Sequence, residues 1–237
     1  MSTRFAEAIT RENIRGYVAL IPDIKCVSPK EGDLLNGRDP VEVSRHLKEY
    51  GAPALSVVTE PAHFGGSPEL LREVVKNTGL PVLRKDFVTH ADMLRETAEL
   101  GAAAVLLICA AADANNLRRL YETALELDLE PLVEVHNAAE MEFAGKLGAR
   151  LIGINNRDIA ILERDDGGPG LTASLAAGAP SGALLISESG ILSASEARLA
   201  VSAGVHALLV GTALWQARDM EAAFRSLRVE RSTACGR

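Results

Sequence analysis

The chain has 237 residues, 47% of them hydrophobic, and its 25 Lys and Arg against 32 Asp and Glu leave a formal net charge of −7. This length suits a single α/β barrel domain over residues 1–237, and the negative charge argues against a general nucleic-acid-binding surface. The three cysteines lack metal-type spacing, and no apolar stretch suits a membrane span or a signal segment, so we expect a cytoplasmic protein with no membrane partner.

Short apolar runs alternate along the chain with segments of helical periodicity, after a polar-amphipathic stretch at residues 1–16. Apolar runs bounded by turn residues are typical of buried parallel strands. The expected strands are residues 18–25, 54–58, 81–87, 103–110, 131–137, 150–158, 183–190 and 206–215. The expected helices are residues 40–51, 67–79, 89–101, 112–128, 138–148, 171–177, 193–204 and 220–228.

Helix start and stop signals support this division. Pro40 opens the first helix and Gly51 ends it, while Ser67 is an expected N-cap and Gly79 the matching stop. Glycine-rich turns leave only a short sixth helix. Eight strand–helix units favour a closed barrel over an open sheet, and no GxGxxG follows the first strand. We therefore expect an α/β protein with one (β/α)8 TIM barrel and a short N-terminal extension.

Five of the expected strands end in charged or amide side chains. These residues are Lys25, Lys85, Glu134, Asn155 with Arg157, and Glu188. An unpaired buried charge is strongly unfavourable, so a strand ends in this way where it opens onto a site. Parallel strands present their carboxyl ends at one face of a barrel, and we expect these groups to converge there in one active site.

Glycine follows the last two strands. Ser189-Gly190 comes after the seventh and Gly211-Thr212 after the eighth, where barrels commonly bind phosphate through backbone N–H groups. The planar guanidinium of Arg157 can bind phosphate or carboxylate through two parallel hydrogen bonds. Lys25 and Lys85, on one face of the barrel, could act as general acids. The set indicates a small substrate that carries a phosphate and at least one further anionic group.

Strand alternation assigns the neighbours of these residues to one face or the other. Arg84 precedes Lys85 and is therefore expected to point outward, toward the helices. His136 shares the face of Glu134, and we expect it to have a structural role at the rim of the barrel.

Six strings in chain order resemble the indole-3-glycerol phosphate synthase family of tryptophan biosynthesis. They are DIKCVSP, LSVVTEPAHFGGS, PVLRKDF, LVEVHN, IGINNRD and SESGI, and the resemblance covers about residues 21–214. The family's reaction closes, decarboxylates and dehydrates 1-(2-carboxyphenylamino)-1-deoxyribulose 5-phosphate to give indole-3-glycerol phosphate. The resemblance implies a carboxy-lyase that needs no cofactor and no metal.

The resemblance also implies roles for individual residues. Lys85 would protonate the substrate ketone, Lys25 would hold the anthranilate carboxylate and act in the dehydration, and Glu134 would be the acid/base partner. The other implied members of the catalytic centre are Asp23, Glu188 and Asn155. The residues implied to bind the substrate and its phosphate are Ser28, Phe64, Phe87, Arg157, Ser189, Gly190, Leu209, Gly211 and Thr212.

The chain departs from the family pattern in a few places. Asp23 replaces the family's glutamate and is one methylene shorter, and Lys30 replaces its second serine. The stretch before the first strand is about 17 residues long, whereas the family has a longer segment that helps to cover the site, and residues 163–170 are also atypical. We expect these departures to bear on substrate identity and rate rather than on the fold.

Other functions stay open at the level of sequence. A phosphoribosyl-sugar isomerase would favour Cys or Asp at the first strand end and Asp at the sixth, where this chain has Lys25 and Asn155. A class I aldolase would use Lys85 as a Schiff base but leaves Lys25 and Arg157 unexplained. A non-catalytic barrel would bind a phosphorylated ligand without turnover, with Asp23 as the mark of lost catalysis. We expect a monomer or a weak homo-oligomer.

Overall fold

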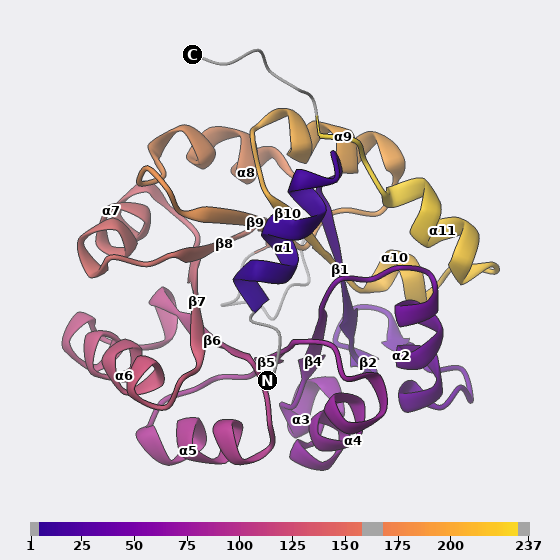
Figure 1. Ribbon diagram of the computed structural model, residues 1–237, viewed down its shortest axis with the longest axis horizontal. Helices are drawn as coiled ribbons and strands as arrows, with labels where there is room; N and C mark the ends of the chain where they lie inside the picture. The colour runs from indigo at the N-terminus through magenta and orange to yellow at the C-terminus, as the bar shows by residue number, and fades with distance from the viewer. Residues whose placement is uncertain (1–4, 158–167, 232–237) are drawn as a thin grey trace.

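The computed structural model describes residues 5–157 and 168–231, and its centre is a closed barrel of parallel strands (Figure 1). The barrel strands are β1 (Ala19–Ile24), β4 (Leu55–Val58), β5 (Val82–Lys85), β6 (Ala104–Ile108), β7 (Glu130–Val135), β8 (Leu151–Asn155), β9 (Leu184–Glu188) and β10 (Ala207–Val210). Each pairs in parallel with the next barrel strand along the chain, and β1 pairs with β10 to close the ring. The expected (β/α)8 TIM barrel is confirmed.

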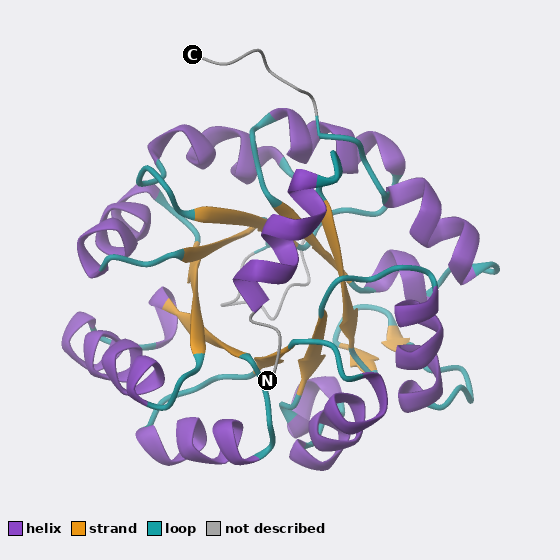
Figure 2. Cartoon of the chain, in the orientation of Figure 1, coloured by secondary structure: helices purple, strands orange, loops and turns teal. Residues whose placement is uncertain are grey.

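Helices surround the ring of strands on its outside (Figure 2). The described helices after β1 are α2 (Pro40–Glu49), α3 (Pro61–Phe64), α4 (Pro68–Thr78), α5 (Ala91–Glu99), α6 (Ala114–Glu126), α7 (Ala138–Leu147), α8 (Gly170–Leu175), α9 (Ala194–Ser202), α10 (Thr212–Trp215) and α11 (Met220–Leu227). The connections hold the 3-10 turns η1 (Cys109–Ala111) and η3 (Ala176–Gly178) and an antiparallel ladder of β2 (Val27–Ser28) with β3 (Gly32–Asp33). Among the described helices, none is long and apolar enough to cross a membrane.

Strand alternation divides the hydrophobic core into two layers. Side chains such as Ile21, Leu83 and Leu106 point into the barrel and pack with one another. Their strand neighbours, such as Leu20 and Val105, pack outward against the helices. Burial of both faces explains why the strands are nearly continuous apolar runs in the sequence.

The N-terminal helix α1 (Phe5–Ile14) lies over the centre of the ring in Figure 1. Phe5 is fully buried among inward-facing strand residues. Its N–H donates to the Glu130 carboxylate at the start of β7 (2.5 Å), and Asn13 Nδ2 donates to the His206 carbonyl oxygen just before β10 (2.8 Å). These contacts are with the starts of strands, so the described part of the N-terminal segment closes the end of the barrel opposite to the expected site.

Most of the expected strands end earlier than the sequence predicts, and in two of them helical structure takes over. Residues 206–215 are not one strand, because β10 stops at Val210 and Thr212–Trp215 is the helix α10. Trp215 Nε1 donates to the Asp23 carbonyl oxygen at 2.8 Å, and this contact with a distant strand fixes the turn. Likewise β6 ends at Ile108, and the next three residues form η1. The sequence stays apolar beyond the ends of both β6 and β10, so the apolar pattern alone could not locate the ends of these strands.

The helix signals at Ser67 and Gly79 are confirmed. Ser67 Oγ accepts a hydrogen bond from the Leu70 N–H at 3.1 Å, and Gly79 follows α4 in the left-handed conformation. The sixth helix is short, as expected, since α8 has 6 residues. Of the atypical segment 163–170, residues 163–167 lie outside the described part of the chain.

Candidate active site

Two adjoining pockets open at the carboxyl ends of the barrel strands. The apolar pocket is lined by Lys25, Val58, Glu60, Phe64, Lys85, Asp86, Phe87, Leu106, Ile108 and Glu134. The polar pocket is lined by Asp23, Lys25, Lys85, Arg157, Ser189, Gly190, Ile191, Leu192, Leu209, Val210, Gly211 and Thr212. Lys25 and Lys85 line both, so these two side chains lie where the pockets meet.

The apolar pocket has the chemistry that suits a flat aromatic group. Phe64 and Phe87 contribute ring surfaces, and Leu106 and Ile108 contribute aliphatic surface from β6. Lys25 Nζ lies 5.6 Å from the centroid of the Phe64 ring, within the range of a cation–π contact. An aromatic ring that carries a carboxylate would therefore meet apolar surfaces and a cation together.

A tight turn after β4 holds Phe64 in place. The Glu60 carboxylate caps α3 by accepting hydrogen bonds from the backbone N–H groups of His63 (2.7 Å) and Phe64 (3.1 Å). Burial by itself would raise the pKa of Glu60, but the backbone donors and the His63 ring outweigh it and hold the pKa below its ordinary value. Position 66 requires glycine, because a Cβ there would lie 2.1 Å from the Val58 carbonyl oxygen.

Arg84 points away from the pockets, as strand alternation predicts, and anchors the strand end that carries Lys85. The Arg84 residue is buried, at 3% exposure. It donates to Thr59 Oγ1 and Thr97 Oγ1, each at 3.0 Å, and pairs with Glu96 at 2.7 Å. One buried guanidinium thus joins β5 to the end of β4 and to α5, which restricts how far the Lys85 backbone can move.

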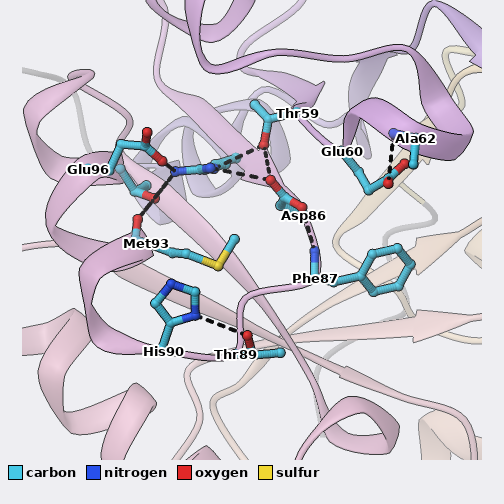
Figure 3. Close-up of polar contacts among 11 residues, drawn as sticks. Thr59, Glu60, Ala62, Asp86, Phe87, Thr89, His90, Met93 and Glu96 are labelled. Atoms are coloured by element: carbon cyan, nitrogen blue, oxygen red, sulfur yellow. Dashed lines mark hydrogen bonds and ion pairs between the residues drawn. The ribbon is translucent and has the colours of Figure 1, made fainter.

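Asp86 carries this network into the apolar pocket (Figure 3). Its carboxylate accepts hydrogen bonds from Thr59 Oγ1 (2.5 Å) and from the Phe87 N–H (2.8 Å), and lies 3.3 Å from the Arg84 guanidinium. Figure 3 shows Asp86 between Thr59 and Phe87, with the Glu60 that caps α3 to the right of Asp86. The buried Arg84 therefore supports the backbone on both sides of the Lys85 side chain.

The polar pocket depends on a strained turn after β9. Ser189 and Gly190 have φ angles of 60° and 67°, and a positive φ is unfavourable for serine. Asn156 Nδ2 holds the turn by donating to the carbonyl oxygens of Glu188 (2.8 Å) and Ser189 (3.2 Å). The buried Arg157 contributes a cation to the same pocket. Strained backbone that its surroundings hold in place is frequent at ligand-binding sites.

The first and last strands meet at Asp23 and Gly211. A Cβ added at position 211 would lie 3.3 Å from Asp23 Cβ, so even alanine there would require Asp23 to shift by a few tenths of an ångström. The Asp23 residue is 4% exposed, and in the described part of the chain its Oδ1 has no hydrogen-bond partner. Asp23 thus presents a buried carboxylate to the wall of the polar pocket.

Lys85 and Glu188 meet across the barrel. Lys85 Nζ lies 3.8 Å from Glu188 Oε2, and Glu188 is fully buried. Glycine at position 153 leaves room for this carboxylate, because a Cβ there would lie 1.9 Å from Glu188 Oε1. Gly153 on β8 therefore sets where Glu188 lies, and the ion pair in turn fixes the Lys85 ammonium group at the junction of the pockets.

Glu134 projects from β7 into the apolar pocket and is fully buried. His136 lies at the rim, as expected, and in addition contacts this carboxylate: His136 Nε2 is 3.3 Å from Glu134 Oε1. Burial by itself would lower the pKa of His136, but Glu134 and then Glu140 outweigh it and raise the pKa above the ordinary value. The alternation that places Glu134 and His136 on one face is confirmed.

Most of the expected site residues line one of the two pockets, but three of them do not. Glu188 lines neither pocket but lies within ion-pair distance of Lys85, which lines both. Asn155 is buried at the end of β8, where its Oδ1 accepts a hydrogen bond from the Arg157 N–H at 3.1 Å. Ser28 lines neither pocket, and its Oγ accepts hydrogen bonds within its own loop.

That loop also contains the substituted position Lys30. Ser28 Oγ accepts hydrogen bonds from the N–H groups of Lys30 (3.4 Å) and Glu31 (3.3 Å), and Ser28 is 3% exposed. Its hydroxyl therefore shapes the connection between β1 and α2.

Two polar residues of the apolar pocket, Glu60 and Asp86, are absent from the predicted site. Glu60 follows the second apolar run just as the other charged residues follow theirs, so the same rule could have found it. Asp86 directly follows Lys85, but nothing in its local sequence indicates whether it faces the pocket. Leu106 and Ile108 carry no polar signal and become site residues only through their position in the barrel.

Solved structures with low sequence identity share the fold. An N-acetylmannosamine-6-phosphate 2-epimerase from Clostridium perfringens aligns with a TM-score of 0.65 at 15% identity, covering 84% of this chain and 88% of that one. An orotidine 5'-phosphate decarboxylase from Pyrococcus horikoshii aligns with a TM-score of 0.65 at 15% identity, covering 88% of this chain and 96% of that one. Similarity at this level supports the barrel architecture alone.

Curated relatives are much closer in sequence. The chain is 42% identical to the indole-3-glycerol phosphate synthase of Pyrococcus abyssi over 207 residues, which is 87% of this chain and 90% of that protein. It is 44% identical to the enzyme of the same name from Deinococcus radiodurans over 227 residues, or 94% and 84% of the two chains. The family model for indole-3-glycerol phosphate synthase matches residues 1–227. The chain therefore belongs to the indole-3-glycerol phosphate synthase family.

Proposed function

We propose that this protein converts 1-(2-carboxyphenylamino)-1-deoxyribulose 5-phosphate into indole-3-glycerol phosphate, carbon dioxide and water. The observation that carries the proposal is the pair of adjoining pockets with Lys25 and Lys85 at their junction. The substrate has a carboxylated aromatic ring at one end, a phosphate at the other and a ketone between them. The apolar pocket suits the ring, the polar pocket suits the phosphate, and the two lysines lie where the ketone would be.

Ring closure is the first step that these groups would support. The aromatic carbon that bears the carboxylate attacks the ketone carbon, and the ketone oxygen needs a proton as the bond forms. We assign this general-acid role to Lys85, whose position is held by Glu188 at 3.8 Å and by the Arg84 network behind β5. A well-positioned general acid contributes about 10²- to 10⁴-fold to a rate.

Decarboxylation and dehydration follow. Lys25, beside the Phe64 ring, binds the substrate carboxylate, which leaves as carbon dioxide and restores the aromatic ring. The new hydroxyl group then departs as water, which requires an acid at the oxygen and a base for the proton that is lost. We assign the acid to Lys25 and the base to Glu134, with Asp23 and Asn155 as further members of the centre.

The phosphate would bind in the polar pocket. Its binding groups would be the Arg157 guanidinium, the Thr212 hydroxyl and the backbone around Gly190 and Gly211, with Leu209 as an apolar neighbour. Glycine allows close approach of the backbone to phosphate oxygens, and arginine can bind two of them at once.

We further propose that the chain works as one domain in the cytoplasm, as a monomer or a weak homo-oligomer. Its substrate would be a small phosphorylated anion. The formal net charge of −7 supports this proposal, because a net charge far from zero keeps a protein soluble and disfavours self-association.

The test is to mix the purified protein with the carboxyphenylamino-deoxyribulose phosphate and to follow the fluorescence of the indole product. Turnover is expected, and ligand binding without product at high protein concentration would instead establish a non-catalytic barrel.

Lys85→Ala should lower kcat by about 10²- to 10⁴-fold with an unchanged circular dichroism spectrum. Lys76→Ala, at an exposed position of α4, is the matched control and should keep full activity. Borohydride trapping of a substrate adduct on Lys85 would support an aldolase instead.

A further inference from the structure

Glu134 is a carboxylate buried in a mostly apolar wall. It is 0% exposed, and Leu106 and Ile108 of the adjacent strand β6 line the same pocket. In the part of the chain that the structure describes, its oxygens accept no hydrogen bond, and only His136 brings a nitrogen within ion-pair distance, at 3.3 Å. Burying a carboxylate without a counter-charge is strongly unfavourable, so a cationic His136 at this distance would stabilise the Glu134 side chain where it lies.

The His136 ring is itself held from its other side. Its Nδ1 lies 3.4 Å from Glu140 Oε2, and the same oxygen accepts the His136 backbone N–H at 2.7 Å. Glu140 Oε1 accepts a hydrogen bond from Asn137 Nδ2 at 2.8 Å, while Asn137 Oδ1 caps α7 by accepting the Glu140 N–H. The imidazole therefore lies between two carboxylates, one from the end of β7 and one from the first turn of α7.

The charges around this ring favour its protonated form. Glu134 faces it from β7 and Glu140 from α7. Cys109 in η1 lies close to both carboxylates, and burial, followed by their charges, raises the pKa of its thiol to about 12, so it stays neutral. The described groups packed around His136 thus bring negative charge, which outweighs burial and raises its pKa above the ordinary value.

We propose that His136 is a positioning residue of this active site, which as an imidazolium pairs with the Glu134 carboxylate and keeps it directed into the apolar pocket, while Glu140 holds the imidazolium. The inference rests on the acid/base role proposed for Glu134. A carboxylate beside a cation is a weaker base that returns its proton readily, which suits a group that must accept and release a proton in each turnover.

The test is the dependence of kcat and KM on pH, from neutral to alkaline values, in His136→Gln. Glutamine keeps a hydrogen-bond donor but cannot carry the charge. We expect kcat at neutral pH to fall by about 10- to 100-fold, with a much smaller change in KM. The alkaline decline of kcat that follows loss of the His136 proton in the wild type should be absent from the variant.

Glu140→Gln provides an independent measurement that does not depend on how His136→Gln folds. It keeps the imidazole but removes one of its two carboxylates, so the same decline should shift to lower pH. His90→Gln is the control, because His90 is exposed in the loop after β5. Its pH profile should match that of the wild type.

Glu134→Gln tests the acid/base role of Glu134 separately from the positioning role of His136. A Glu134→Gln variant with normal turnover would refute the role of Glu134 and the inference together. An inactive Glu134→Gln beside a His136→Gln with wild-type kcat and pH profile would overturn the inference alone. A His136→Gln that loses thermal stability but keeps the alkaline decline would also overturn it, because the role would then be only structural.

Discussion

Gly153→Ala tests whether the position of Glu188 matters for catalysis. The added methyl group would lie 1.9 Å from Glu188 Oε1, more than 1 Å inside the closest approach of about 3.0 Å that such a carbon tolerates. Because Glu188 is fully buried, its carboxylate must move by about that distance, and the contact of 3.8 Å with Lys85 moves with it. A displacement of about 1 Å in a catalytic arrangement can cost about 100-fold in rate. Overpacking costs about 1–3 kcal/mol of stability.

The assay measures kcat, KM and thermal unfolding of Gly153→Ala beside the matched control Gly145→Ala. Gly145 lies within α7, and a Cβ there would come no closer than 3.8 Å to the neighbouring Pro180. The control should be stabilised by about 1 kcal/mol through helix propensity, with unchanged kcat. We expect Gly153→Ala to remain folded at room temperature, to keep its KM within a few-fold and to lose about 100-fold in kcat. A folded Gly153→Ala with wild-type kcat would refute the reasoning.

Three further predictions address other parts of the molecule. Asp23→Glu should raise kcat, because the extra methylene advances the carboxylate by roughly 1 Å; a fall in kcat would mean that the site has been adapted to the shorter side chain. The folded-state pKa of His136 is raised, so its contribution to stability is complete below its unfolded value of about 6.5 and is lost as pH rises through the folded value. The difference in melting temperature between wild type and His136→Gln should therefore be largest under acidic conditions, and a difference that grows with pH would contradict this sign. Phe5→Ala should lower the unfolding free energy by about 3–5 kcal/mol while the folded fraction keeps its kcat, since α1 lies at the opposite end of the barrel; a large loss of kcat at full folding would show otherwise.

The sequence predicts those residues of the candidate site that directly follow a buried apolar run. Lys25, Lys85 and Glu134 were identifiable because a charge at the end of a buried apolar run requires a local reason. Glu60 obeys the same rule, and applying it to the second run would have included it. Ser28 illustrates a limit of motifs, because a motif names a residue without saying whether its hydroxyl faces the ligand or its own loop, and here Oγ accepts two backbone N–H groups of its loop.

The amino-acid sequence by itself determined the order of strands and helices, the closed barrel and the face on which the polar strand ends meet. These properties follow from apolar periodicity and capping residues such as Ser67, which act over a few neighbouring positions. Only the tertiary structure decided which distant groups meet. The contact of Lys85 with Glu188, the need for Gly153 and the placement of α1 across the far end of the barrel arise when strands remote in sequence close into a ring. Local pattern carries no information on such pairings, because they depend on the register of the whole barrel.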